Sequence, residues 1–358
     1  MEFRLDDDQI DLQQTVARFF EDRYPLDAIH EREGGAVDRV AWRALADLGI
    51  FGLLVDPADG GSGLGVVEAA LVFEQIGSHL VPGPLMWSTL AATVIDADRR
   101  AAVIDGSTVV AGVDLSAPSE TGTDVGSGST LTTGTPVESV VDADLVLAVG
   151  PDAVTVLERD ALERDGLGPV QPLDSLDPLT SVAAVASLAG GAGLGEPGLG
   201  GTDLGGRDVA DRLRLVGSVL VAAELVGVAG RALEVARSYA LEREQFGVPI
   251  GSFQAVKHML ADMYVRVTVA QSATYAAAAV VDRPGPGDDP VRSVDAAVLL
   301  ATEAAIDGAS DAVQILGGMG FTWDMLPNYL LKRAWHLSLR FEAGDARAQA
   351  AGRALVGA

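Results

Sequence analysis

The 358-residue sequence contains no cysteine, and this absence excludes disulfide bonds, thiolate metal sites and cysteine nucleophiles. Histidine is scarce as well, since the four histidines stand far apart and show no metal-ligand spacing. No GxxxxGK phosphate loop occurs, and Gly126-Ser-Gly-Ser-Thr130 lacks the strand-to-helix surroundings of a nucleophilic serine. The sequence therefore gives no support for metal, thiol or serine-hydrolase chemistry.

Basic residues are also few, with 25 Lys and Arg against 51 Asp and Glu and a net charge of −26. Nucleic acids and anionic membranes would be repelled, so neither is a predicted partner. The N-terminus is acidic and lacks a signal peptide, and the longest apolar run, Leu215–Ala223, falls short of the roughly 18 residues of a membrane-spanning helix. We therefore expect a soluble cytoplasmic protein in which a few arginines or helix N-termini hold any anionic ligand.

Hydrophobic residues make up 48% of the chain, which is enough for a large core divided over two or three domains. Residues 1–98 show helical spacing of apolar side chains, with an acidic start at Asp6 to Asp8. Further helices are predicted over 40–48, 66–80 and 86–95, and Gly49 is expected to end the first of these. The first domain is therefore predicted to be all helical.

Residues 99–205 have a different pattern, in which short β-rich runs alternate with Gly, Ser, Thr, Pro and Asp. This pattern predicts a small antiparallel β-domain that ends in a glycine-rich linker. An earlier glycine-rich stretch, Gly60-Gly-Ser-Gly-Leu-Gly65, fits a dinucleotide loop poorly because a helical segment precedes it. This stretch could form either a flexible turn or a phosphate contact, and the sequence leaves both interpretations possible.

From residue 206 to 358 helical periodicity returns in long segments, which predicts a C-terminal helical bundle. Helices are expected over 208–243, 252–283, 291–316, 328–340 and 345–355. Gly217, Gly227 and Gly230 would permit close helix contact in the first of these. Small residues from Ala297 to Ala312 would do so in the third.

One connection, Tyr239–Lys257, reads as a helix end, a tight turn and a new helix with Ser252 as its cap. It brings together Arg243, Phe246 and two amides, Gln245 and Gln254, which are side chains that suit a phosphate-containing ligand. From the residues alone, Arg243 could equally pair with a neighbouring carboxylate. Likewise, Gly317-Gly318 could serve only as a helix cap.

Three motifs, in this domain order, resemble the acyl-CoA dehydrogenase family of flavoproteins. They are Leu48-Gly-Ile-Phe-Gly-Leu-Leu-Val-Asp-Pro57, Arg243-Glu-Gln-Phe-Gly-Val-Pro-Ile-Gly-Ser-Phe-Gln254 and Asp311-Ala-Val-Gln-Ile-Leu-Gly-Gly-Met-Gly-Phe321. The resemblance covers most of the chain and implies an α+β fold. It would consist of an N-terminal helical domain (1–98), a small central antiparallel β-domain (99–205) and a C-terminal helical bundle (206–358).

The resemblance further implies that FAD lies between subunits and that this chain contacts its adenine and pyrophosphate end. By position, Arg243 would pair with the pyrophosphate, because a guanidinium fork matches phosphate oxygens. Gly317 and Gly318 would let the backbone approach the cofactor. The implied FAD-binding residues are Arg243, Gln245, Phe246, Gln254, Gln314, Gly317 and Gly318.

The β-domain departs from the family pattern, in which a Thr-Glu-Pro…Gly-Ser-Asp-like loop and a Trp-Ile-Ser/Thr strand hold the flavin ring. None of the four tryptophans lies between residues 99 and 205, and Glu196-Pro197 stands in the glycine-rich linker. The isoalloxazine pocket is therefore predicted to be incomplete or absent on this chain.

The sequence also departs from the family pattern at the positions of the catalytic base. Dehydrogenation needs a carboxylate that removes the proton α to the thioester while hydride leaves for the flavin. Phe341-Glu342 resembles the family's usual Tyr-Glu pair, but an ungapped count places Phe341 at the position of the glutamate. Gly217 stands at the family's second base position, and Ser218 replaces a substrate-contacting arginine. Glu342 is the one candidate base, and the alternative is that the chain carries none.

These departures resemble the shorter, degenerate subunit of bacterial heteromeric acyl-CoA dehydrogenases. We therefore expect a non-catalytic partner subunit of an α2β2 complex with a related subunit. The resemblance implies an acyl-CoA substrate, often as bulky as a steroid thioester, and electron-transfer flavoprotein or a similar acceptor. Two alternatives are a homomeric dehydrogenase that uses Glu342 and a flavin-free structural or regulatory protein.

Overall fold

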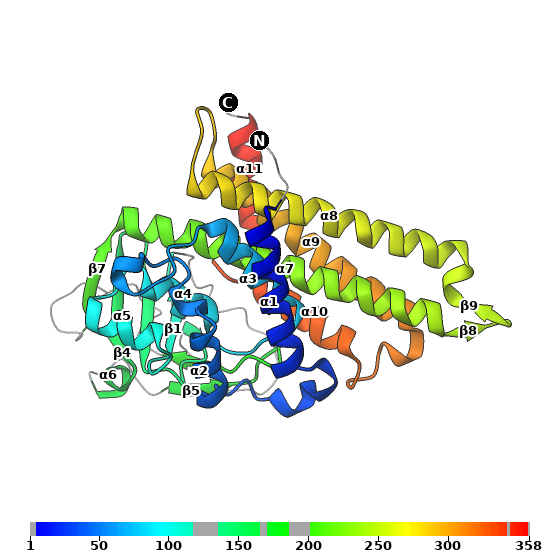
Figure 1. Cartoon of the computed structure of the whole chain (residues 1–358), viewed down its shortest axis with the longest axis horizontal. Helices are drawn as coiled ribbons and strands as arrows, with labels where there is room; N and C mark the ends of the chain where they lie inside the picture. The colour runs from blue at the N-terminus through cyan, green and yellow to red at the C-terminus, as the bar shows by residue number, and fades with distance from the viewer. Residues whose placement is uncertain (1–4, 117–134, 165–169, 186–200, 342–343, 357–358) are drawn as a thin grey trace, which may run out of the picture. The chain divides into compact units, whose positions relative to one another are not determined.

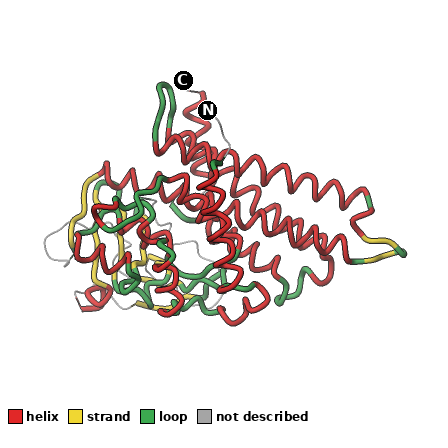
Figure 2. Tube along the Cα trace, viewed as in Figure 1, coloured by secondary structure: helices red, strands yellow, loops and turns green. Residues whose placement is uncertain are grey.

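The computed structural model describes residues 5–116, 135–164, 170–185, 201–341 and 344–356 (Figure 1). Helices dominate, and the strands lie in one part of the chain's middle and in one short hairpin (Figure 2). The predicted fold class, helical at both ends with a central sheet, is confirmed. The chain divides into two compact units, one of Met1–Glu31, Leu64–Val81 and Ser218–Ala358 and the other of Arg32–Gly63 and Pro82–Gly217. The three predicted domain boundaries remain a proposal.

The first unit is helical. Its helices include α7, although α7 begins at Arg207, a residue of the second unit. Helix α1 begins with a capping box in which Gln9 N donates to Asp6 Oδ1 at 2.8 Å. The acidic start of the sequence thus caps the first helix. The helices are α1 (Asp7–Arg23), α3 (Val66–Ser78), α7 (Arg207–Glu242), α8 (Gln254–Asp282), α9 (Pro290–Leu316), α10 (Leu326–Leu337) and α11 (Gly344–Val356).

Helices α3 and α7 approach closely at two glycines, each of which lies beneath a carbonyl group of the other helix. A Cβ atom on Gly77 would stand 2.0 Å from the Glu224 carbonyl oxygen, and one on Gly227 would stand 1.9 Å from the Glu74 carbonyl oxygen. The predicted role of Gly227 in close helix contact is confirmed, whereas a Cβ on Gly230 meets nothing within 4 Å.

Buried ion pairs fix the C-terminal part of the chain to α7 and α9. Arg340 donates to Glu224 at 3.3 Å, and both side chains are almost fully buried. Arg347 on α11 donates to Asp295 at 2.6 Å and to the Ser218 hydroxyl at 3.3 Å. Breaking one partner of such a pair leaves a buried charge and is strongly destabilising. These pairs therefore fix where the end of the chain lies.

The second unit contains a seven-stranded sheet in the order β5-β6-β2-β1-β3-β4-β7. It is mixed, because β1 and β3 pair in parallel while the other neighbours are antiparallel. The prediction of a purely antiparallel sheet is corrected at that one pair. The strands are β1 (Val110–Asp114), β2 (Thr135–Glu138), β3 (Leu145–Val149), β4 (Ala153–Glu158), β5 (Val170–Leu173), β6 (Val182–Val185) and β7 (Thr202–Gly206).

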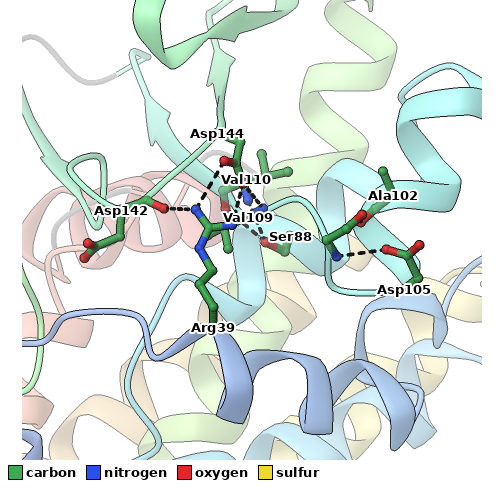
Figure 3. A network of polar contacts seen from close by, with 9 residues as sticks. Arg39, Ser88, Ala102, Asp105, Val109, Val110, Asp142 and Asp144 are labelled. Atoms are coloured by element: carbon green, nitrogen blue, oxygen red, sulfur yellow. Dashed lines mark hydrogen bonds and ion pairs between the residues drawn. The ribbon is translucent and has the colours of Figure 1, made fainter.

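A polar network joins the helices of this unit to the sheet (Figure 3). Arg39 donates to Asp144 at 2.7 Å and to the Asp142 carbonyl at 2.6 Å, while Val109 N donates to the same Asp144 carboxylate at 2.7 Å. Ser88 bonds both to the N–H and to the carbonyl of Val110. The network therefore anchors β1 from two helices. The helices of this unit are α2 (Arg39–Asp47), α4 (Leu85–Ala92), α5 (Ala97–Ile104) and α6 (Arg159–Arg164).

Within the described residues, α7 alone is long and apolar enough to cross a membrane by length and composition. However, 83% of its apolar window is buried inside the protein, as is common for the core helix of a soluble protein.

Candidate functional site

The predicted corner contains a small hairpin formed by β8 (Glu244–Gln245) and β9 (Val248–Pro249). Its two turn residues, Phe246 and Gly247, have φ of 54° and 79°, so both are left-handed as in a type I′ turn. Such positions favour Gly or Asn, and a bulky residue there is strained. Phe246 is nevertheless 94% exposed, so burial within the chain does not account for the strained aromatic residue.

Arg243 stands at the point where α7 passes into this hairpin. Its carbonyl accepts a hydrogen bond from Ile250 N at 2.8 Å, which closes the corner. Its side chain is exposed and makes no ion pair with any residue that the structure describes. The alternative that Arg243 pairs with a neighbouring carboxylate of its own chain is therefore not realised among the described residues, and the guanidinium is exposed to solvent.

Helix α8 begins at Gln254, and its first N–H groups receive no side-chain cap. The prediction that Ser252 caps this helix is wrong, because its hydroxyl donates instead to the Pro249 carbonyl at 2.7 Å. The side chain of Phe253 packs edge-on against Phe246, with 6.2 Å between ring centroids. The first N–H groups of α8 thus have no side-chain acceptor, and the helix start keeps its partial positive charge.

The second predicted segment lies at the end of α9, where Gln314 is exposed. Gly317 ends the helix with φ of 64°, and a Cβ on Gly317 or Gly318 would meet nothing within 4 Å. By contrast, a Cβ on Gly320 would stand 2.3 Å from the Val313 carbonyl oxygen. The close contact with Val313 therefore explains why residue 320 is glycine, and the positive φ explains why residue 317 is glycine. Neither reason applies to Gly318, whose backbone is exposed and accessible to a ligand.

The two segments meet at the same end of the helices in the first unit. The Tyr239 hydroxyl on α7 contacts the Met319 sulfur after α9 at 3.8 Å. Arg266 on α8 pairs with Asp311 on α9, and the hairpin lies at the tips of α7 and α8 (Figure 1). The six predicted FAD-binding residues other than Gly317 are exposed: Arg243, Gln245, Phe246, Gln254, Gln314 and Gly318.

Of the residues predicted for catalysis, Glu342 lies outside the described residues. Its neighbour Phe341 is buried and has φ of 61°. Ser218, which stands where the family carries an arginine, is buried and accepts its hydrogen bond from Arg347 of α11. The role of Glu342 remains a prediction.

The glycine-rich stretch Gly60–Gly65 precedes α3, and a carboxylate already occupies the start of that helix. Asp282, at the end of α8, accepts from Val66 N at 2.9 Å and from Val67 N at 3.2 Å. A phosphate would compete with this carboxylate, so the structure favours the turn over the phosphate contact.

A buried polar cluster was not predicted from the sequence. Glu74 on α3 accepts from the Tyr275 hydroxyl at 2.6 Å and from Gln271 at 2.9 Å. Burial raises the pKa of the Glu74 carboxyl against the effect of these two hydrogen bonds, and burial together with Glu74 raises the pKa of Tyr275. Its members lie 197 and 201 residues apart, so local sequence patterns carry no signal for it. The described residues contain no cluster of His, Asp and Glu that could hold a metal ion.

Comparison with known proteins defines the class. Residues 6–97 match the acyl-CoA dehydrogenase N-terminal domain, and residues 205–347 match the acyl-CoA dehydrogenase C-terminal domain. The acyl-CoA dehydrogenase IpdE2 of Mycolicibacterium smegmatis is 30% identical over 90% of this chain and 91% of its own length. The acyl-CoA dehydrogenase FadE34 of Mycobacterium tuberculosis is 32% identical over 82% of this chain, which spans only 39% of that longer protein.

Among solved structures, a chain of the ChsE4-ChsE5 complex from Mycobacterium tuberculosis matches over the full length of both chains, with a TM-score of 0.81 and 25% identity. Together with the sequence matches, this similarity supports the fold and the family over the whole chain and not only at the three motifs. The chain belongs to the acyl-CoA dehydrogenase family, whose members are flavoproteins.

Proposed function

We propose that this chain is the non-catalytic subunit of a heteromeric, FAD-dependent acyl-CoA dehydrogenase. In this role it binds the adenine and pyrophosphate end of an FAD at a subunit interface, and a related subunit supplies the flavin pocket and the base. The complex removes hydrogen across the α,β-bond of an acyl-CoA thioester in the cytoplasm. Electron-transfer flavoprotein or a similar acceptor then takes the electrons.

The outward-facing corner carries this proposal. A guanidinium without an intrachain counter-ion, an uncapped helix start and an open glycine backbone lie at one end of the first unit. Each of these features suits phosphate oxygens or close contact with a nucleotide. Because these groups face outwards, a cofactor held there extends away from this chain, which favours a site shared with another subunit.

The residues present fit the adenine and pyrophosphate half of FAD. Arg243 would hold the pyrophosphate, the N-terminus of α8 would add partial positive charge, and Gln254 and Gln314 would hydrogen-bond the adenosine part. Phe246 would cover that part with its exposed ring, which would account for its strained conformation. When bound, FAD accepts the hydride that leaves the β-carbon of the thioester.

The heteromeric part of the proposal has two supports. The β-domain sequence lacks the family's flavin-ring motifs, and no carboxylate stands at the family's second base position. In addition, a similar chain occurs in the ChsE4-ChsE5 complex, which contains two differently named proteins. Another chain similar in fold occurs in a structure named as a steroid acyl-CoA dehydrogenase, and a bulky acyl group such as a steroid side chain is the substrate class we propose.

The first test is to purify the chain alone and together with a co-expressed, full-length acyl-CoA dehydrogenase encoded beside it. We expect flavin absorbance and dye-reducing activity only in the pair. Arg243→Ala should abolish FAD retention by the pair, whereas Arg18→Gln, at an exposed cation of α1, should retain it. Flavin and turnover in the chain alone would contradict the proposal.

A second variant separates the alternatives. Glu342→Gln should leave turnover of the pair nearly unchanged if the base belongs to the partner. Loss of activity with flavin retained would favour the self-sufficient enzyme. Absence of flavin under every condition, with the pair still assembled, would favour the flavin-free structural protein.

A further inference from the structure

A surface hollow of about 320 Å³ lies between α7 and α8. It shares Leu241, Gly251 and Lys257 with the Tyr239–Lys257 connection, but none of the proposed FAD-binding residues lines it. Its volume is at the lower end of the roughly 300–1,000 Å³ of small-molecule sites. The side chains that define it come from both helices and are Leu233, Arg237 and Leu241 of α7 and Lys257, Leu260 and Tyr264 of α8. We call it the α7–α8 hollow.

The charge of the hollow differs from that of the chain as a whole. Arg237 and Lys257 are exposed, and neither forms an ion pair within the described part of the chain. By comparison, Arg231, six residues before Arg237 on α7, is paired with Glu234 at 2.5 Å. In a protein with 51 acidic residues, the hollow is thus lined by two cations that have no acidic partner among the described residues, and an anion bound there would be attracted to both.

Lysine is rare enough in this protein to make the position of Lys257 informative. The sequence contains two lysines, Lys257 and Lys332. Lys332 lies over the ring of Trp323, with its nitrogen 3.0 Å from the ring centroid. Lys257 has no such aromatic contact and faces the hollow.

The rest of the lining is apolar. Leucine side chains come from both helices, and small residues such as Ala261 leave the space open. Leu241 and Tyr264 are 58% and 62% exposed, so apolar surface remains in contact with water. Burial of such surface by a ligand is favourable at about 25 cal/mol for each Å².

We propose that the α7–α8 hollow binds a small amphipathic anion. Its carboxylate or sulfonate head lies between Arg237 and Lys257, and its apolar body, of the size of a medium-chain acyl or aryl group, covers the leucines. The site is independent of the FAD contact proposed for Arg243. An acidic helix of a partner protein is the competing occupant, but the small volume of the hollow and its two cations suit a small anion better than a helix.

The two lysines provide a footprinting experiment with an internal control. The full chain is treated with an amine-acetylating ester with and without octanoate, and modification is followed by peptide mass spectrometry. Octanoate at ten times its Kd should slow acetylation of Lys257 about tenfold, because only the free site reacts. Acetylation of Lys332 should not change. The neutral 1-octanol should protect Lys257 far less than octanoate.

Variants then locate the site. Arg237→Gln should raise the Kd for octanoate roughly tenfold, as expected for loss of one charged hydrogen bond. Ala261→Phe, at an exposed position, should block binding by filling the hollow. Arg18→Gln changes the net charge equally and should leave the Kd unchanged, and Arg243→Ala should also leave it unchanged, which separates this site from FAD binding.

Three results would overturn the proposal. One is equal protection of Lys257 by octanoate and octanol, and another is an unchanged Kd in Arg237→Gln. The third is protection of Lys257 by a partner subunit but by no small anion, which would make the hollow a protein contact.

Discussion

Glu74 is a carboxyl group buried between two helices, and burial raises its pKa above the ordinary value of 4.5. The folded protein therefore keeps this proton at pH values where the unfolded chain has released it. As pH rises through that window the unfolded state binds fewer protons, so the free energy of unfolding falls. The loss is about 1.4 kcal/mol for each unit by which the folded pKa exceeds the unfolded one.

Glu74→Gln removes this titration and keeps an amide that can bond to Tyr275 and Gln271. We expect the variant to gain melting temperature relative to the parent as pH rises from 5 to 8. Thermal unfolding at both pH values measures the effect, and Glu303→Gln, at an exposed carboxylate of α9, controls for the loss of one charge. An equal difference between variant and parent at both pH values would show that burial does not govern Glu74.

Single residues show where sequence reasoning ends. Arg243 and Gln254 are predicted to contact FAD because their motif is local and the family pattern is specific, and this role stays a prediction. The conformation of Phe246 was not predicted, because φ of 54° is set by the hairpin and opposed by its own side chain. The Glu74 cluster could not be predicted from the sequence for a different reason. Its partners are distant in sequence, and each alone resembles an ordinary polar residue of an amphipathic helix.

At the scale of elements, α7 offers two glycines for a matched test. Gly227→Ala would place a Cβ 1.9 Å from the Glu74 carbonyl oxygen, whereas Gly230→Ala meets nothing within 4 Å. We expect Gly227→Ala to cost about 3 kcal/mol or more through overpacking. Gly230→Ala should gain about 0.5–1 kcal/mol from helix propensity.

Urea denaturation, followed by circular dichroism at 222 nm, compares the two glycine variants with the parent. Opposite signs for the two changes are the expected result. Equal effects would mean that α3 and α7 do not cross at these glycines.

Helices were predicted more reliably than strands because each helix carries its own evidence. The ends of the predicted helices were located to within a few residues by the apolar period, by Gly49 and by the prolines before α9. The parallel pairing of β1 with β3 depends on long-range contacts that no local pattern encodes. The prediction that Ser252 caps α8 is wrong because the Ser252 hydroxyl donates to a competing acceptor, the Pro249 carbonyl.

At the scale of the whole molecule, the net charge of −26 should destabilise the folded state by self-repulsion. Raising NaCl from 20 to 200 mM screens this repulsion, and each ~1 kcal/mol regained should raise Tm by about 2–4 °C. The sequence pI of about 4.3 supplies the control, because the net charge is smaller at pH 5 and the salt effect should shrink there. The same increment at pH 5 and pH 7 would contradict this explanation.

The cap that Asp282 places on α3 has a consequence for the order in which the chain folds during synthesis. The carboxylate is 215 residues downstream of the Val67 N–H that it accepts from. At about 5–20 residues per second, a ribosome needs roughly 10–40 s to add that length. Throughout this interval the start of α3 lacks its cap, and its apolar face lacks α8. The newly made N-terminal helices are thus a natural substrate for chaperones until the last third of the protein emerges.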